Sequence, residues 1–181
     1  MNNTVTTRIL TAELPVREYV ENYVDIPKFA KLCEVCPNYG RRWSCPPYDF
    51  SVPGLWERYG QIRLMAMQII PETREEKERA AREPRDFLAP YRASLESALA
   101  AREKEQPRSL RLNPGSCVGC VKCAREDGQP CRREDMCRCS VESLGSDVGK
   151  VAAELLHTPL VWGQNGEAPA YFLLVGAILT E

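Results

Sequence analysis

Histidine is almost missing from this sequence, because His157 is the only one among its 181 residues. A Ser–His–Asp or Cys–His hydrolase would have to use this one side chain. It falls at the end of a predicted helix, where the helix dipole favours a histidine without any catalytic role. The sequence also lacks a G-x-G-x-x-G motif and a P-loop, so it gives no support for nucleotide binding. The C-x3-C-x2-C spacing of radical S-adenosylmethionine enzymes is absent as well.

The sequence has no excess of charge of either sign, with 24 Lys and Arg against 25 Asp and Glu and a net charge of −1. This balance gives no support for broad electrostatic binding of nucleic acid. No run of about 18 apolar residues is present, and the first residues do not have the basic and apolar regions of a signal peptide. We therefore expect a cytoplasmic protein that binds neither membrane nor nucleic acid.

Cysteine, by contrast, is abundant, with nine residues in two tight clusters. A secreted domain with this many cysteines would be held together by disulfides, which are usually dispersed along the chain. Clustered thiols in a reducing compartment indicate metal binding instead.

The denser cluster is the stretch CVGCVKCAREDGQPCRREDMCRC, which holds six of the nine cysteines. Cys117, Cys120 and Cys123 have the C-x2-C-x2-C spacing of bacterial ferredoxins, and Cys131 follows after seven intervening residues. Four thiolates match one [4Fe–4S] cluster, with one ligand for each iron. In a plain ferredoxin the fourth cysteine follows after three residues and precedes a proline. Here the gap is longer and Pro130 comes first, which leaves open whether Cys131 serves the same cluster.

The other cluster has the spacing C-x2-C-x8-C, formed by Cys33, Cys36 and Cys45. Three thiolates leave a fourth position unassigned, and three interpretations stay open. One iron is left open for water or substrate, or the site is a zinc with three sulfurs and one other ligand. In the third interpretation, a fourth cysteine comes from the other cluster, with Cys131, Cys137 and Cys139 as candidates. For Cys137 and Cys139, which form C-x-C, metal ligands, free thiols and a redox pair are equally open.

The rest of the chain alternates predicted strands and helices. Apolar patterns predict strands near residues 5–10, 61–70 and 109–112, and a pair of strands in 158–163 and 170–180 around a turn at 164–166. Helices are predicted after Pro15, over an apolar stripe from Leu88 to Leu99, and after the cap at Asp147. The charged residues 72–83 are a solvated helix or a linker.

These elements predict one domain over residues 1–181, with an α+β or α/β fold and a sheet of four or five strands. Helices flank the sheet, and the two cysteine loops, 31–49 and 115–140, lie at its edge or end. Prolines and glycines in the first loop exclude regular structure there.

Two motifs together resemble a cysteine-rich family of unknown function labelled "predicted metal-binding protein", found mainly in anaerobic bacteria and archaea. The first is Cys33-x2-Cys36-Pro-Asn-Tyr-Gly-x2-Trp-Ser-Cys45-Pro-Pro. The second runs from Cys117 through Gly-x-Pro-Cys131-Arg to Ser-Val-Glu-Ser-Leu-Gly at residues 140–145. The resemblance implies a single domain with an iron–sulfur or related metal centre and no established reaction. Cys137 and Cys139 depart from the family pattern and look like additions.

We predict from the cysteine pattern an iron–sulfur protein that transfers electrons to or from a redox protein partner through one or two [4Fe–4S] clusters. The predicted ligands are Cys33, Cys36, Cys45, Cys117, Cys120, Cys123 and Cys131. Two alternatives remain, namely a metalloenzyme with an open iron at the three-cysteine loop and a structural zinc module that binds a protein. The sequence decides neither whether the protein is an enzyme nor its oligomeric state.

Overall fold

Residues 4–181 are described in a computed structural model, and they contain one antiparallel sheet of four strands in the order β1-β2-β4-β3. The strands are β1 (Val5–Pro15), β2 (Gln61–Pro71), β3 (Leu110–Leu112) and β4 (Phe172–Thr180). The predicted α+β fold with a four- to five-stranded sheet is confirmed. The α/β alternative does not apply, because every strand pair is antiparallel.

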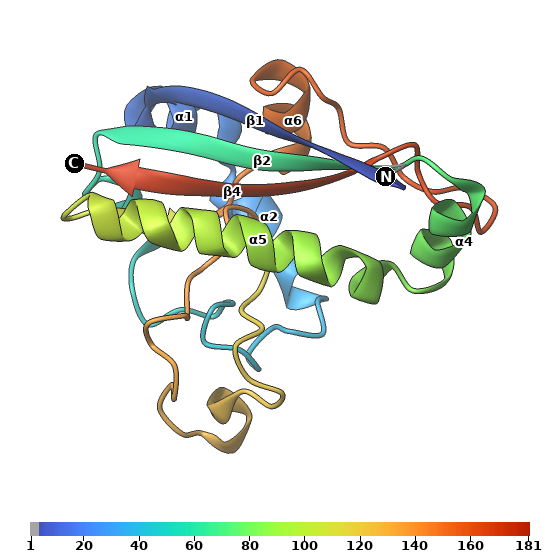
Figure 1. The fold of residues 1–181 in the computed structure, drawn as a ribbon. Helices are drawn as coiled ribbons and strands as arrows, with labels where there is room; N and C mark the ends of the chain where they lie inside the picture. The colour runs from blue at the N-terminus through green and yellow to red at the C-terminus, as the bar shows by residue number, and fades with distance from the viewer. Residues whose placement is uncertain (1–3) are drawn as a thin grey trace.

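Six α-helices and two 3₁₀ helices complete the described part of the chain (Figure 1). They are α1 (Val16–Tyr23), α2 (Ile26–Glu34), α3 (Val52–Trp56), α4 (Arg74–Arg82), α5 (Pro84–Glu105), α6 (Val148–Glu154), η1 (Ala124–Asp127) and η2 (Glu142–Leu144). Helix α6 begins as predicted, with the Asp147 side chain accepting a hydrogen bond from the Lys150 amide at 3.0 Å. Helix α5 begins at Pro84 and continues through Pro90.

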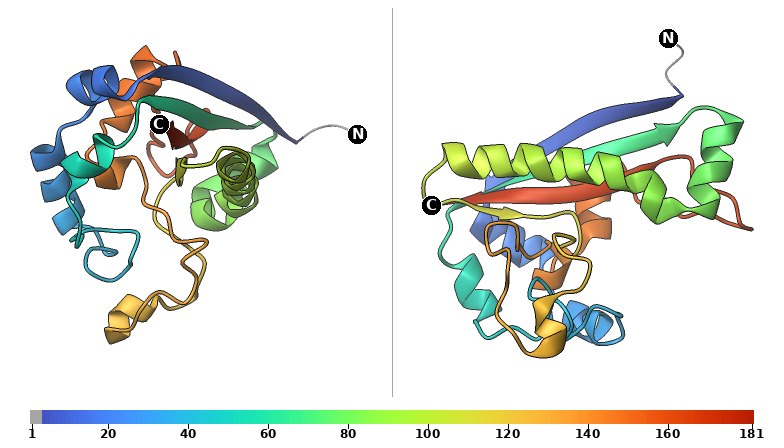
Figure 2. Two further views of the ribbon diagram at one scale, coloured as in Figure 1. Left: turned by 90° about the vertical axis from the view of Figure 1, so that its left-hand side faces the viewer. Right: turned by 60° about the horizontal axis from the view of Figure 1, so that its bottom comes forward.

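The sheet is covered on both faces, because β2 is apolar on both of its sides. Ile62 and Leu64 pack on one face in the core that contains α1 and α6. Met67 and Ile69 pack on the opposite face against α5. Figure 2 shows α5 on one side of the sheet and α1 and α6 on the other. The edge strand β1 is less completely covered, with Arg8 and Glu13 exposed.

Two expectations about secondary structure are wrong. Helix α2 was not expected, and it carries Cys33 in its last turn. The predicted strand over residues 158–163 does not form. Strand β4 pairs with β2 on one side, and on its other side the short strand β3 occupies Ala177–Leu179, while residues 158–163 form no ladder with the rest of β4. Val161 and Trp162 consequently lie exposed in an irregular segment.

The cysteine loops lie together on one side of the sheet, below α5 in Figure 1. The second loop leaves the sheet after β3 and returns to the same point, where the Asn113 amide donates to the Cys139 carbonyl at 2.8 Å. We call residues 31–50 and 115–139 together the cysteine lobe. No helix in the described part of the chain is long and apolar enough to cross a membrane.

Candidate metal centre

Arg125 joins the two cysteine loops. Its guanidinium donates hydrogen bonds to the carbonyls of Arg42 and Cys45, at 2.9 and 2.7 Å, and to that of Pro47. It also lies over the Trp43 ring, 4.9 Å from the centroid. One side chain from the second loop thus fixes the backbone of the first loop around Cys45.

A second set of contacts fixes Cys117 against the first loop. The Cys117 amide donates to Ser44 Oγ at 2.9 Å, and Arg42 donates to the Cys117 carbonyl at 2.9 Å. Next to it, the Asn38 side chain donates to Ser116 Oγ at 3.2 Å. Ser44 is buried, so this junction is shielded from solvent. The two motifs, which lie about 80 residues apart in sequence, therefore form one structural unit.

Five cysteines line one small enclosed space of about 20 Å³ within the second loop. They are Cys117, Cys120, Cys123, Cys131 and Cys137. Cys131 thus lies with its three neighbours rather than with the first loop. Cys137, whose role the sequence left open, is the fifth thiol of this group. The short loops C-x2-C-x2-C turn the first three side chains inward, and the return of the chain towards Asn113 brings in the other two.

A hydrogen bond between two thiols of this group shifts the pKa values of both. A hydrogen bond from the Cys137 thiol lowers the pKa of Cys117 to about 6, and the Gly119 amide, 3.4 Å from Cys117 Sγ, acts in the same direction. The same hydrogen bond raises the pKa of Cys137. These hydrogen bonds therefore favour the thiolate form of Cys117, which is the form that binds metals.

The three cysteines of the first loop line a separate cavity of about 230 Å³. Cys33 ends α2, and a tight turn, with the Cys36 amide donating to the Cys33 carbonyl at 3.0 Å, places Cys36 beside it. Cys45 is buried while Cys36 is exposed. Burial raises the pKa of both Cys33 and Cys45. Across the cavity lie serines and a carboxyl group, namely Ser116, Ser140, Ser143 and Glu142.

Neither group of cysteines is gathered tightly around a single point. In residues 4–181, no three His, Cys, Asp or Glu side chains are close enough together to hold one metal ion. A [4Fe–4S] cluster needs a wider arrangement, because each ligand binds a different iron. Four or more thiols around one space are the donor set that such a cluster takes, so the five-cysteine group fits it in ligand type and number.

A comparison of the sequence with models of protein families shows which family the chain belongs to. The model of a family described as "Predicted metal-binding protein (DUF2284)" matches residues 20–179. This chain belongs to that family. The match includes all nine cysteines, so the resemblance seen in the two motifs is confirmed and extends over most of the chain. Neither the curated proteins nor the solved structures gave a match.

Cys139 is not among the residues that line either cavity. Burial raises its pKa, and the nearest groups that act on it are Tyr48 and Cys45. Tyr48 Oη lies 3.0 Å from the Ser44 carbonyl oxygen and 2.7 Å from Ser143 Oγ. Cys137 and Cys139, two residues apart, therefore point into different surroundings.

Glu103 fixes the far end of the second loop, and no sequence motif indicated this role. Its carboxylate accepts hydrogen bonds from Arg138 at 2.8 Å and from the Arg111 guanidinium at 2.5 Å. Arg111 also donates to the Asp135 carbonyl at 2.8 Å. Because Arg138 lies between Cys137 and Cys139, this ion pair connects the cysteine lobe to α5 and β3.

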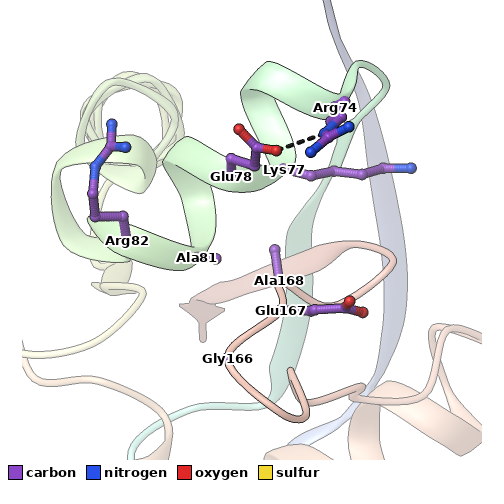
Figure 3. A pocket seen from close by; sticks show the side chains of 8 residues that line it. All are labelled: Arg74, Lys77, Glu78, Ala81, Arg82, Gly166, Glu167 and Ala168. Atoms are coloured by element: carbon purple, nitrogen blue, oxygen red, sulfur yellow. Dashed lines mark hydrogen bonds and ion pairs between the residues drawn. The ribbon is translucent and has the colours of Figure 1, made fainter.

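A further hollow lies away from the cysteines, between α4 and residues 166–168 (Figure 3). Its volume is about 560 Å³, and Arg74 there is paired with Glu78 at 2.7 Å. Both of these side chains are largely exposed, so this is the solvated face of a charged helix. His157 is likewise exposed, beyond the end of α6, and lines neither cysteine cavity.

Proposed function

We propose that this member of the metal-binding family is an iron–sulfur protein that carries electrons, with a [4Fe–4S] cluster held by Cys117, Cys120, Cys123 and Cys131. The observation that carries the proposal is the convergence of these four thiols, with Cys137, on one enclosed space. The cluster would supply one-electron transfer. The chain's own residues would supply the thiolates and a shielded environment.

The basic side chains around this loop divide into two groups. Arg125 and Lys122 are engaged elsewhere, Arg125 with carbonyls of the first loop and Lys122 with Asp127 at the surface. Arg132 and Arg133 line the cysteine space itself. Positive charge at this position offsets the negative charge of thiolates, and such charge is one of the factors that set a cluster's potential.

A second cluster at Cys33, Cys36 and Cys45 would be connected to the first by a short route. Ser44 Oγ lies 3.8 Å from Cys45 Sγ and accepts the hydrogen bond of the Cys117 amide at 2.9 Å. The buried Ser44 hydroxyl thus contacts both the thiol of Cys45 and the backbone amide of Cys117, which are ligands of the two different centres. This arrangement supports two centres that exchange electrons.

Exposed apolar side chains surround both loops and support docking of a redox protein partner. They are Leu32, Val35, Phe50, Val118 and Val121. Val35 is 83% exposed, and Val121 is fully exposed. Weak electron-transfer complexes use small interfaces of this kind close to the cofactor.

A metalloenzyme is the second candidate, and the cavity of about 230 Å³ beside only three cysteines favours it. An iron without a fourth thiolate there would be open to a small substrate or water. A structural zinc module is the third candidate, with thiolates as the zinc ligands.

Anaerobic purification followed by iron, sulfide and zinc analysis tests these candidates. We expect about four or about eight irons per chain with equal sulfide, depending on whether one or both loops are loaded. The variant C120S should lose about four of them, whereas C139S, its matched control, should keep all. A colourless protein with stoichiometric zinc contradicts the iron–sulfur proposal.

A further inference from the structure

Glu142 is the buried group in the lobe region that the iron–sulfur proposal does not use. It begins η2 and lines the cavity that also contains Cys33, Cys36 and Cys45. Its Oε2 atom is buried and has no hydrogen-bond partner among the described residues. Buried carboxyl groups in proteins are usually paired, hydrogen-bonded or bound to a metal.

The position of Glu142 is fixed by the same packing that fixes Cys33. Val141, which precedes it, and Leu144, at the end of η2, are completely buried. At the end of η2, Gly145 has φ 95° and passes so close to Ile26 of α2 that a Cβ there would lie 2.7 Å from the Ile26 side chain. Because α2 also carries Cys33, the thiol and the carboxyl group are attached to two elements in direct contact.

The other polar side chains on this wall are already engaged. Ser143 Oγ donates to the Ser140 carbonyl at 2.8 Å and lies 2.7 Å from Tyr48 Oη. Ser116 Oγ accepts a hydrogen bond from the Asn38 side chain at 3.2 Å. Among the described side chains that line this cavity, Glu142 is the one with a buried polar atom that has no hydrogen-bond partner.

We propose that Glu142 is the fourth protein ligand of a [4Fe–4S] cluster at Cys33, Cys36 and Cys45, with Oε2 bound to the iron that no thiolate reaches. On binding, the carboxylate displaces a water ligand of that iron, so that one Fe–O bond breaks as the Fe–Oε2 bond forms, the water leaves to solvent and no oxidation state changes. The four donors line one cavity, and a [4Fe–4S] cluster takes one donor for each of its four irons. The inference rests on the proposed function, because it assumes iron in the first loop.

This ligand set differs chemically from four cysteines. A carboxylate is a hard oxygen donor, whereas thiolates are soft donors that suit iron–sulfur clusters. The iron bound by Glu142 is therefore the one expected to exchange its ligand or leave most readily. Cys139 is the competing candidate for the fourth position, because its thiol lies near Cys45 but does not line the cavity.

The test compares E142Q, E142C and C139S with the unaltered chain, each reconstituted anaerobically with ferrous iron and sulfide. Iron content, Mössbauer spectra and EPR spectra are recorded for each. We expect the unaltered chain and C139S to hold complete clusters. E142Q, which keeps the shape of the side chain, should lose one iron per chain and show the EPR signal of an oxidised three-iron cluster. E142C should restore the fourth iron with an all-thiolate Mössbauer spectrum.

The possible results distinguish failure of the Glu142 proposal from failure of the iron–sulfur proposal. Complete clusters in E142Q, with spectra unchanged from those of the unaltered chain, contradict the role of Glu142. Loss of the fourth iron in C139S instead assigns that position to Cys139. The variant C36S tests whether the first loop holds iron at all. If C36S has the same iron content as the unaltered chain, the first loop holds none, and the two-cluster form of the proposed function is contradicted. If E142Q does not fold, E142C and E142A replace it. Glu142 is the fourth ligand if E142C keeps the fourth iron and E142A, with its smaller side chain, loses it.

Discussion

Strand β2 and the cysteine lobe are packed on different principles. Along β2, Ile62, Leu64 and Ile69 are completely buried among other apolar side chains. Within the cysteine lobe, residues 31–50 and 115–139, only Ser44, Cys45 and Ala124 are buried. The lobe is held instead by guanidinium groups on backbone carbonyls and by its own turns.

This difference has a physical consequence. Burial of apolar surface stabilises the sheet without any bound group. A loop that buries little apolar surface must gain its order from other interactions, and bound metal is a common source in cysteine-rich segments. The sheet should therefore behave as a stable platform, and the lobe as a structure that depends on its metal.

Removal of the metal should produce the largest effect and should be confined to the lobe. After treatment with a chelator and reductant, we expect amides in 117–139 to lose their protection from hydrogen exchange, with local stability falling to about 0 kcal/mol. Amides of β2 should keep theirs. Exchange measured by mass spectrometry checks this, with the metal-loaded chain as control. Equal protection of the lobe before and after chelation would mean that its own contacts suffice.

Leu64→Ala tests whether the sheet is stabilised by apolar burial independently of the metal. Leu64 is completely buried, so the cavity left by the substitution should lower the free energy of unfolding by about 3 kcal/mol. Metal content per folded chain should not change. Ile9→Ala is the matched control, because Ile9 is 55% exposed and its loss should cost about 0.5 kcal/mol or less. Denaturant unfolding measures both, and a loss of metal in Leu64→Ala would contradict the independence of the two regions.

Glu103→Gln should weaken the connection between the two regions. It leaves the guanidinium groups of Arg111 and Arg138 without their counter-charge, and we expect a loss of about 2 kcal/mol. The value is below that of a fully buried pair, because Arg138 is 23% exposed. Hydrogen exchange of residues 133–139 should rise. Unchanged exchange there would show that the ion pair does not position the loop.

The same ion pair predicts a dependence on pH. Burial acts to raise the pKa of Glu103, but hydrogen bonds from Arg138 and Arg111 outweigh it, so the pKa is lowered on folding. This stabilisation is fully present above the ordinary glutamate pKa of about 4.3 and is lost as the pH falls through the lower folded value. The stability difference between the unaltered chain and Glu103→Gln should therefore be constant near neutral pH and shrink in acid. A difference that persists in acid contradicts this account.

Arg125→Ala should separate the two loops from each other. It removes three hydrogen bonds to carbonyls and the contact with Trp43, and we expect a loss of about 1–2 kcal/mol. Arg132→Ala is the matched control, because within residues 4–181 the Arg132 guanidinium donates a single hydrogen bond, to the Lys122 carbonyl at 3.2 Å. Thermal unfolding and exchange of residues 41–47 measure the difference. Equal effects of the two variants would contradict the claim that Arg125 joins the two loops.

Glu126→Gln should have the smallest effect, although it connects the same two loops. Its ion pair with Arg41 spans 2.8 Å, but the Arg41 side chain is 63% exposed. We expect a change of about 0.5 kcal/mol or less, abolished at about 1 M salt. A loss as large as that of Arg125→Ala would mean that exposed ion pairs contribute as much as the guanidinium–carbonyl contacts to joining the loops.

The sequence by itself determined the elements that depend on near neighbours. Alternating apolar residues predicted β1 and β2, and helical spacing predicted α5 and α6, because these periodicities follow from local backbone geometry. The spacing C-x2-C-x2-C identified three thiols that must lie close together, because two intervening residues allow little separation.

Only the tertiary structure decided which distant groups meet. The sheet order brings β3 beside β4, and the return of the chain to Asn113 then places Cys137 with the four predicted thiols and Cys139 apart from them. It also buries Glu142 beside Cys33 through the contact of η2 with α2. Such meetings depend on the packing of whole elements about the sheet, which local spacing does not specify.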